Sequence, residues 1–270
     1  MPELPEVETT VRGLVPVLAG RRLVFVEARR EDLRRPFPPD LRQRLTGAVV
    51  TQLGRRAKYG LIATDRGDTL VFHLGMSGKW RIDPAALGPH DHFLLVTDES
   101  RRLALNDPRR FGSLDLVRTD ELPDHAPFAR MGPEPLEEAF SVDYLQAALQ
   151  GRTAPIKALL LDQRIVAGLG NIYVCEALHA ARIAPGRAGG RIARERLAGL
   201  VAAIRAVLLS AIEAGGSSLR DYARPSGELG YFSSQWRVYG REGEACECGA
   251  AIRRRAEGGR STFHCPRCQR

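Results

Sequence analysis

The hydrophobic pattern of the chain changes its period near the middle, and this change limits the folds available to it. From about residue 21 to 118, apolar residues come in short runs separated by Gly, Pro, Asp and Arg, a spacing typical of an antiparallel sandwich or barrel. The runs cover residues 23–26, 49–53, 61–64, 70–74, 93–96 and 114–117. A helix over residues 6–18 is expected to precede them. The first half is therefore predicted to be an antiparallel β-sandwich with flanking helices.

A segment rich in proline and acidic residues, 121–141, ends this pattern and indicates a boundary. After it, apolar residues recur with the period of a helix. Helices are predicted over residues 142–149, 155–161, 172–180 and 194–214, and Gly215-Gly216 ends the last of them. Together with a cysteine-rich C-terminal segment, the pattern predicts an α+β multidomain protein with domains at 1–132, 133–228 and 229–270.

The charge balance points to a polyanionic partner. The 270 residues carry a formal net charge of +8, and the lysines are Lys58, Lys79 and Lys157, so arginine supplies nearly all of the positive charge. The guanidinium fork suits phosphate oxygens, which makes nucleic acid the expected partner. A GC-rich genome would explain arginine in place of lysine but not the positive balance. Because there is no run of eighteen apolar residues and the first fifteen residues contain acids, we expect a soluble cytoplasmic protein.

The N-terminus has the residues needed for catalysis by an amine. Removal of Met1 would leave Pro2 with a secondary amine, which condenses with a sugar aldehyde to a positively charged iminium, an electron sink. An α-amino group has a pKa of about 7.7 to 8.0, so more of it is neutral near pH 7 than of a lysine. Glu3 and Glu6 add two carboxylates that are candidates for proton transfer. The alternative is an ordinary N-terminus that opens a helix.

Four of the five cysteines lie in the last twenty-five residues, as Cys246-Glu247-Cys248, sixteen further residues, and Cys265-Pro266-Arg267-Cys268. Two close pairs of thiols are typical of a zinc ribbon, and nothing indicates an oxidising compartment in which disulfides would form. We therefore predict one structural Zn²⁺. The fifth, Cys175, lies in an apolar helical pattern and is interpreted as a packing residue.

Two loops carry residue types suited to a distorted duplex. Phe111, flanked by arginines after a proline, is a candidate wedge for a base stack, with Arg109 taking the place of a lost base. Met76, in a glycine-rich turn, is a second candidate. The alternative for Phe111 and Met76 is burial in the core.

Three further features remain open on the residues alone. Asn171, after Gly168-Leu169-Gly170, is expected to cap a helix whose free N–H groups would bind phosphate, although an ordinary helical corner is the alternative. Lys58 is interpreted as binding phosphate or as lowering the pKa of the amine, or as a basic strand end facing water. The His90-Asp91-His92 run has no further ligand types nearby and predicts no metal site.

Six motifs in one order resemble formamidopyrimidine-DNA glycosylase, a bacterial enzyme that excises oxidised purines and then nicks the strand. The resemblance runs from Met1 to the last cysteine pair. The motifs are Met-Pro-Glu-Leu-Pro-Glu-Val-Glu-Thr at the start, Arg-Ala-Lys-Tyr at 56–59, His-Leu-Gly-Met-Ser-Gly at 73–78, Asp-Pro-Arg-Arg-Phe-Gly at 107–112, Gly-Leu-Gly-Asn-Ile-Tyr at 168–173 and the cysteine cluster. The resemblance implies a helix-two-turn-helix bundle in the second domain and a zinc-ribbon β-hairpin in the third.

The resemblance also assigns the site residues. The catalytic set is Pro2, Glu3 and Lys58, the DNA-binding set is His92, Met76, Arg109, Phe111, Asn171 and Arg260, and the zinc ligands are Cys246, Cys248, Cys265 and Cys268. The implied activity is base excision repair: removal of 8-oxoguanine or formamidopyrimidines from duplex DNA, and cleavage at the abasic site by β,δ-elimination through a Pro2 Schiff base. A monomer associated with the nucleoid is expected, because an asymmetric lesion offers no two-fold axis.

One position departs from the family pattern. The family has two residues between the first two cysteines, whereas this chain has one, which puts the geometry and affinity of zinc binding in doubt. Two other functions stay open: an endonuclease VIII-like enzyme for oxidised pyrimidines, and a zinc-ribbon protein that binds damaged DNA without catalysis. Residues 223–230 have the composition of a mobile lid and are the candidate contact to the lesion base.

Overall fold

The computed structural model describes residues 1–217, 225 and 230–270. Its contacts divide the chain into two compact units, residues 1–129 with 214–233 and residues 130–213 with 234–270. The expected three-domain division stays a prediction, and most of the candidate lid at 223–230 lies outside the described residues. Among the helices of the described part, none is both long and apolar enough to cross a membrane.

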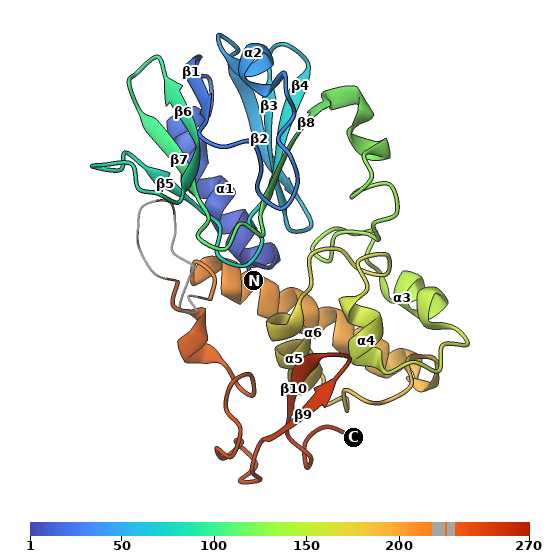
Figure 1. The fold of residues 1–270 in the computed structure, drawn as a ribbon. Helices are drawn as coiled ribbons and strands as arrows, with labels where there is room; N and C mark the ends of the chain where they lie inside the picture. Colours follow the sequence, from blue (N-terminus) through green and yellow to red (C-terminus); the bar gives the residue numbers. More distant parts are fainter. Residues whose placement is uncertain (218–224, 226–229) are drawn as a thin grey trace. The chain divides into compact units, whose positions relative to one another are not determined.

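Two four-stranded antiparallel sheets form the frame of the first unit (Figure 1). The first sheet has the order β1 (Leu23–Ala28), β6 (Asp91–Thr97), β7 (Arg102–Asn106), β5 (Lys79–Ile82). The second has the order β2 (Val50–Arg56), β3 (Tyr59–Thr64), β4 (Asp68–His73), β8 (Ser113–Arg118). All six predicted strands are present. The sequence pattern did not predict β5 and β7.

The core of this unit combines helix α1 (Leu4–Leu18) with both sheets. Val7, Val11, Leu14 and Leu18 recur at helical spacing and are buried, so α1 presents one apolar face to the strands. Trp80 of β5 is the aromatic centre, because its ring lies edge-on to Phe72 at 5.6 Å and to Phe93 at 6.2 Å. The unit also contains two short helices, α2 (Leu41–Leu45) and η1 (Thr119–Asp124).

The second unit is helical with a β-hairpin. Its helices are α3 (Val142–Leu149), α4 (Ile156–Leu161), α5 (Asn171–Ala180) and α6 (Arg194–Glu213), with a short η2 (Gly189–Arg191). These match the predicted ranges to within one residue. A further short helix, η3 (Phe232–Gln235), precedes the hairpin of β9 (Arg253–Glu257) and β10 (Arg260–His264). Gly258 and Gly259 form its two-residue turn with φ of 56° and 73°, which other residues rarely adopt.

The hairpin packs on α5 through a small hydrophobic cluster. Cys175 of α5 lies in it together with Val238, Ile252, Phe263 and the zinc-ligand candidates Cys246 and Cys265. Cys175 is fully buried, as expected for a packing residue. The α+β architecture is confirmed.

Candidate active site, DNA-contact loops and metal centre

The N-terminal segment is held firmly. Pro2 is buried, as are Glu3 and Glu6, while Met1 is 47% exposed. Glu3 is the N-cap of α1 and forms a reciprocal capping box with Glu6. The Glu6 carboxylate accepts hydrogen bonds from the Glu3 N–H at 2.8 Å and from the Ser217 N–H at 2.7 Å. Because both carboxyl oxygens of Glu6 accept backbone hydrogen bonds, this geometry favours Glu6 as an anchor of the segment rather than as a proton carrier.

Lys58 lies in the turn between β2 and β3 and is buried, which excludes the alternative of a basic strand end facing water. His73 of β4 is paired in register with Tyr59, the residue that follows Lys58. Burial, and then the charge of Lys58, lowers the pKa of His73 to about 4. Its Nδ1 accepts a hydrogen bond from the Gly75 N–H at 3.0 Å, so the ring is neutral. Sequence reasoning did not single out His73, although it opens the 73–78 motif.

Met76, Arg109 and Phe111 are all exposed, with 39% of Met76 and 44% of Phe111 accessible. This excludes burial in the core for both apolar side chains. The Arg109 guanidinium lies over the Phe111 ring at 4.9 Å, within the range of a cation–π contact. Exposed apolar side chains next to an arginine are suited to insertion into a base stack.

His92 was expected to contact DNA, but its side chain is buried rather than exposed at the surface. Its ring is buried, and Nε2 lies 3.0 Å from the backbone carbonyl of Asp107, to which it must donate. Burial lowers the pKa of His92, so this neutral tautomer is favoured. The DNA contact expected for His92 stays a prediction, and its described role is to support the loop that carries Arg109.

Asn171 was expected to cap α5, and this was wrong. Gly170 is the N-cap, and Asn171 is the first helical residue. Its Nδ2 donates to the Ser261 carbonyl of β10 at 2.8 Å, while Oδ1 is buried with no hydrogen-bond partner among the described residues. Lys157 of α4 donates to the same carbonyl at 3.1 Å. Two donors therefore fix the strand residue that follows Arg260, whose own side chain is exposed.

Glu176 of α5 holds the segment that leads into the hairpin. Its buried carboxylate accepts hydrogen bonds from the backbone N–H groups of Arg237, Val238 and Tyr239 at 2.8, 3.0 and 2.8 Å. The three donors come from consecutive residues, so a single side chain fixes this stretch of backbone. These hydrogen bonds hold residues 237–239, which precede the hairpin, against α5.

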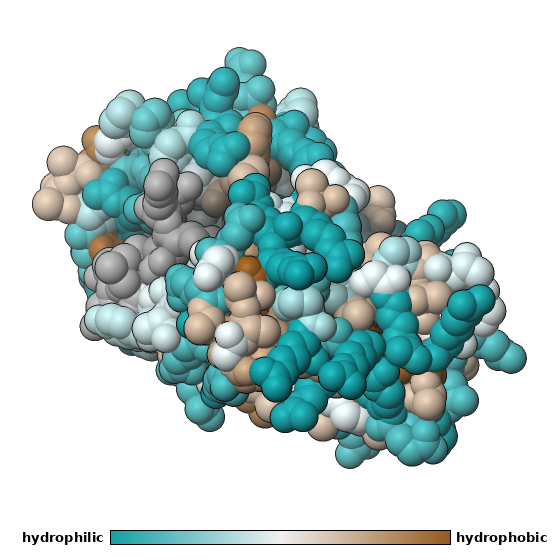
Figure 2. Space-filling model, turned by 90° about the horizontal axis from the view of Figure 1, so that it is seen from below, coloured by the Kyte–Doolittle hydropathy of each residue, from teal (hydrophilic) through white to brown (hydrophobic). Residues whose placement is uncertain are grey.

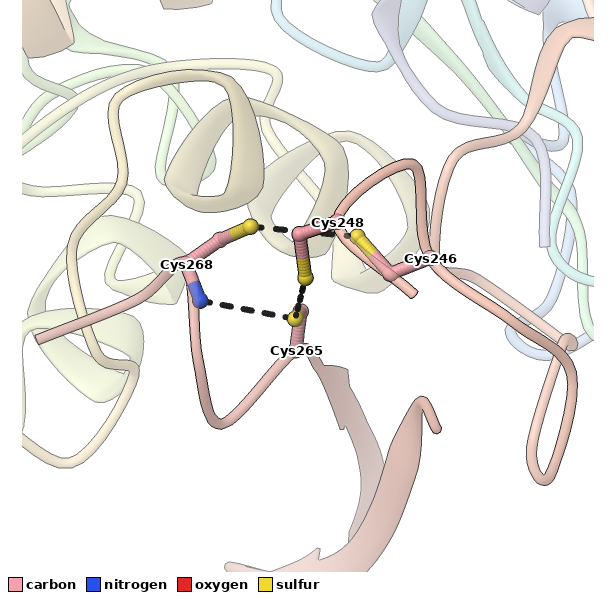
Figure 3. A group of neighbouring side chains, drawn as sticks. All are labelled: Cys246, Cys248, Cys265 and Cys268. Carbon is pink, nitrogen blue, oxygen red and sulfur yellow. Dashed lines mark hydrogen bonds between the residues drawn. The ribbon is translucent and has the colours of Figure 1, made fainter. Parts of the chain in front are cut away.

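The four C-terminal cysteines form a metal-binding group. Their sulfur atoms point toward one another (Figure 3) and all lie within 4.8 Å of one another. Cys246 and Cys268 are 3.9 Å apart at Sγ, and Cys248 and Cys265 are 3.5 Å apart. Tetrahedral zinc with Zn–S bonds of about 2.3 Å requires sulfur separations of about 3.8 Å. The shortened first pair is therefore compatible with a four-thiolate site.

The surroundings of these thiols also fit a cation. A hydrogen bond from the Ala250 N–H lowers the pKa of Cys248 to about 7. The hydrogen bond between Cys268 and Cys248 raises the pKa of Cys268 to about 12. His179 of α5 lies with Nε2 3.4 Å from the Cys246 sulfur, where it can orient that ligand. A divalent cation shared by the four sulfur atoms would stabilise their thiolate forms.

The surface is consistent with a hydrophilic partner. On the face shown in Figure 2, hydrophilic side chains predominate among the coloured residues, and hydrophobic ones are scattered in small groups. The net charge of the whole chain is +8. A polyanion suits such a surface better than an apolar partner does.

Comparison with known proteins defines the class. The model of the formamidopyrimidine-DNA glycosylase N-terminal domain matches residues 1–114, and the model of the formamidopyrimidine-DNA glycosylase H2TH domain matches residues 131–223. Formamidopyrimidine-DNA glycosylases from Rhizorhabdus wittichii and Novosphingobium aromaticivorans are 71% and 64% identical to this chain over the full length of both proteins. The chain therefore belongs to the formamidopyrimidine-DNA glycosylase family, and the resemblance found in its motifs is confirmed.

Solved structures agree with this assignment. The crystal structure of the MutM (Fpg) protein from Thermus thermophilus has a TM-score of 0.90 and 43% identity, and it covers 99% of this chain and 98% of its own. The Lactococcus lactis Fpg in complex with DNA containing an abasic site has a TM-score of 0.91 and 36% identity, with 99% of both chains covered. The α+β fold with a helix-two-turn-helix domain is thus shared over the whole chain.

Proposed function

We propose that this chain is a bifunctional DNA glycosylase and abasic-site lyase that removes oxidised purines from duplex DNA. The observation that carries the proposal is the full-length family match, because it includes an intact Pro2-Glu3 segment that the fold buries and anchors. The Lactococcus lactis relative is described in complex with DNA that contains Fapy-dG, an oxidised purine nucleotide. The preference for purines over oxidised pyrimidines follows from the same family membership.

The chemistry begins with removal of Met1, whose exposure leaves it accessible. The lone pair of the Pro2 nitrogen forms a bond to C1′ of the damaged nucleotide while the glycosidic bond breaks. The base leaves with the bonding electron pair and takes up the proton that the Pro2 nitrogen releases. Glu3 then gives a proton to O4′, the C1′–O4′ bond breaks, and an iminium forms between Pro2 and C1′. Loss of a C2′ proton then expels the 3′ phosphate, and a second elimination expels the 5′ phosphate. We assign the proton transfers at the sugar to Glu3.

Lys58 assists this amine as a second cation. A buried ammonium disfavours protonation of neighbouring groups, and next to burial, which is the larger cause, the charge of Lys58 contributes to the lowered pKa of His73. A neutral Pro2 amine is required for attack, so a nearby positive charge raises its reactive fraction near pH 7. The charge of Lys58 also suits a phosphate of the bound strand.

Further residues are proposed to bind the DNA and to open the duplex. Met76, Arg109 and Phe111 fill the space left by the flipped nucleotide and offset the cost of unstacking it, which is a few kcal/mol. Arg260 binds a phosphate with its exposed side chain, and Asn171 binds one through its backbone N–H at the start of α5, because its side-chain amide already donates to Ser261. His92 supports the loop that carries Arg109. Cys246, Cys248, Cys265 and Cys268 would hold one Zn²⁺, which supplies no chemistry to the reaction and stabilises the hairpin. We also propose that the protein acts as a monomer at the nucleoid.

Borohydride trapping tests the mechanism. The protein is incubated with a duplex that contains 8-oxoguanine and with sodium borohydride, and covalent complexes are separated on a denaturing gel. We expect an adduct with the wild type, a strongly reduced yield in Pro2→Gly, whose primary amine can still form an imine, and retention of the adduct in Lys58→Ala at a reduced rate. The mechanism is wrong if no adduct forms, or if Pro2→Gly traps normally while Lys58→Ala does not. Excision rates on 8-oxoguanine and thymine-glycol duplexes, measured in parallel, test the purine preference.

A further inference from the structure

Two separate loops carry the three residues proposed to fill the duplex, and one buried carboxylate joins them. The β4–β5 turn carries Met76, and the β7–β8 loop carries Arg109 and Phe111. Asp107, which is fully buried, accepts a hydrogen bond at Oδ1 from the Ser77 hydroxyl at 2.7 Å and another at Oδ2 from the Gly112 N–H at 2.8 Å. Its carboxylate thus spans both loops.

Ser77, on the β4–β5 turn, also bonds to the β7–β8 loop at a second point. Its Oγ accepts a hydrogen bond from the Arg109 N–H at 3.2 Å while it donates to Asp107. The buried hydroxyl therefore links the residue after Met76 directly to the backbone of Arg109. His92 adds a third tie, because its ring donates to the carbonyl of Asp107.

The backbones of the two loops also touch. Gly75 has a φ of 63°, and a Cβ on it would lie 2.3 Å from the carbonyl carbon of Phe111 and 2.4 Å from the Gly112 nitrogen. Only glycine fits this approach. Arg110, between the two inserting residues, has a φ of 56°, which a residue with a side chain rarely adopts, and its N–H donates to the Asp107 carbonyl at 3.2 Å. The surrounding bonds hold this conformation in place.

We propose that Asp107 and Ser77 are positioning residues that lock the two loops into one rigid unit, so that Met76, Arg109 and Phe111 enter the duplex together. The inference rests on the proposed function. Side chains that must stay exposed in the free protein cannot be ordered by packing of their own, so their spacing has to be set by the backbone beneath them. The shared carboxylate and hydroxyl supply that constraint without contact to the reacting atoms.

The chemistry of this lock predicts an order among variants. Asp107→Ala removes both acceptors, and Ser77→Ala removes the link to Arg109 and leaves one carboxylate oxygen without its donor. Asp107→Asn still bridges both loops, because its carbonyl can accept from the Gly112 N–H while its amide donates to the Ser77 oxygen. The Ser77 hydroxyl hydrogen then loses its acceptor, which lowers stability but leaves the two loops connected. Rescue by Asp107→Asn thus separates loss of the lock from loss of charge.

The experiment compares two substrates. One is a duplex with 8-oxoguanine opposite cytosine, with 2-aminopurine beside the lesion to report unstacking by its fluorescence. The other is a single-stranded abasic oligonucleotide, which has no base pair to open and reports the amine chemistry alone. Thr69→Val is the matched control, since it removes a buried hydroxyl bond to Thr119 in the same unit but touches neither loop.

We expect Ser77→Ala and Asp107→Ala to slow unstacking and duplex excision by about tenfold or more, and to leave cleavage of the single strand within about twofold of the wild type. Asp107→Asn and Thr69→Val should stay near the wild type on both. In a Met76→Ala, Phe111→Ala background, Ser77→Ala should add little further loss, because the lock acts through those side chains.

Equal losses on both substrates, an unchanged duplex rate in Ser77→Ala and Asp107→Ala, or a full additional loss in the double-alanine background would overturn the lock. If the wild type cleaves neither substrate, the proposed function fails instead. The two failures are therefore distinguishable.

Discussion

The three hydrogen bonds that the Glu176 carboxylate accepts predict how a substitution at this residue changes the stability of the second unit. In Glu176→Gln, the side-chain carbonyl can still accept from Val238 and Tyr239, but the amide group then faces the Arg237 N–H, and two donors meet. One charge-assisted hydrogen bond, worth about 1.5 to 3 kcal/mol, is lost, and the other two lose the charge that strengthens them. We therefore expect the free energy of unfolding to fall by about 2 to 4 kcal/mol.

The assay is urea unfolding of the zinc-loaded protein, combined with the rate of zinc release to a chelator. Zinc release should be faster in Glu176→Gln, because the segment that precedes Cys246 is then held to α5 by fewer and weaker hydrogen bonds. Glu213→Gln, an exposed change on α6, is the control and should alter stability by less than about 0.5 kcal/mol. A loss in Glu176→Gln no larger than in this control would refute the reasoning.

Three further outcomes follow from the same contacts. The lowered pKa of His73, about 4, means that the unfolded chain binds more protons than the folded chain from about pH 6.5 down to pH 4. The stability from His73 is thus complete above pH 6.5 and is lost as pH falls, by on the order of 3 kcal/mol, so His73→Gln should flatten the acid limb of urea unfolding. Arg260→Ala should weaken binding to an abasic duplex and lower the salt slope by about 1, measured by titration at several salt concentrations. Cys246→Ser should reduce zinc from one ion per chain toward none by native mass spectrometry, and expose the hairpin to proteolysis.

The sequence predicted those elements whose apolar residues follow a clear period. It missed β7 because Leu103, Ala104 and Leu105 are buried in a central strand without β-branched residues, so neither alternation nor composition indicated a strand. It missed β5 because Lys79 and Arg81 flank the buried Trp80 in only four residues. Both segments are strands because they pair with neighbours in the sheet, β7 with β6 and β5 with β7.

Site residues can be proposed from sequence where chemistry depends on residue type and local spacing. The two cysteine pairs do come together as a group that could hold a metal ion, whereas the role of Pro2 stays a prediction. The cap at Asn171 was mispredicted because the amide is drawn to the Ser261 carbonyl, ninety residues away. The Asp107–Ser77 connection joins residues thirty positions apart. Such hydrogen bonds follow from the pairing of strands and leave no pattern in the sequence.

The identity of the nucleophile is the central claim, and mapping of the trapped complex tests it most directly. After borohydride reduction with an abasic duplex, nuclease and protease digestion leaves a sugar remnant on the attacking amine, which peptide mass spectrometry locates. The chain offers few amines, since its lysines are Lys58, Lys79 and Lys157. We expect the remnant on Pro2, in a peptide that lacks Met1. A remnant on Lys58, or a complex formed by protein that retains Met1, would contradict it.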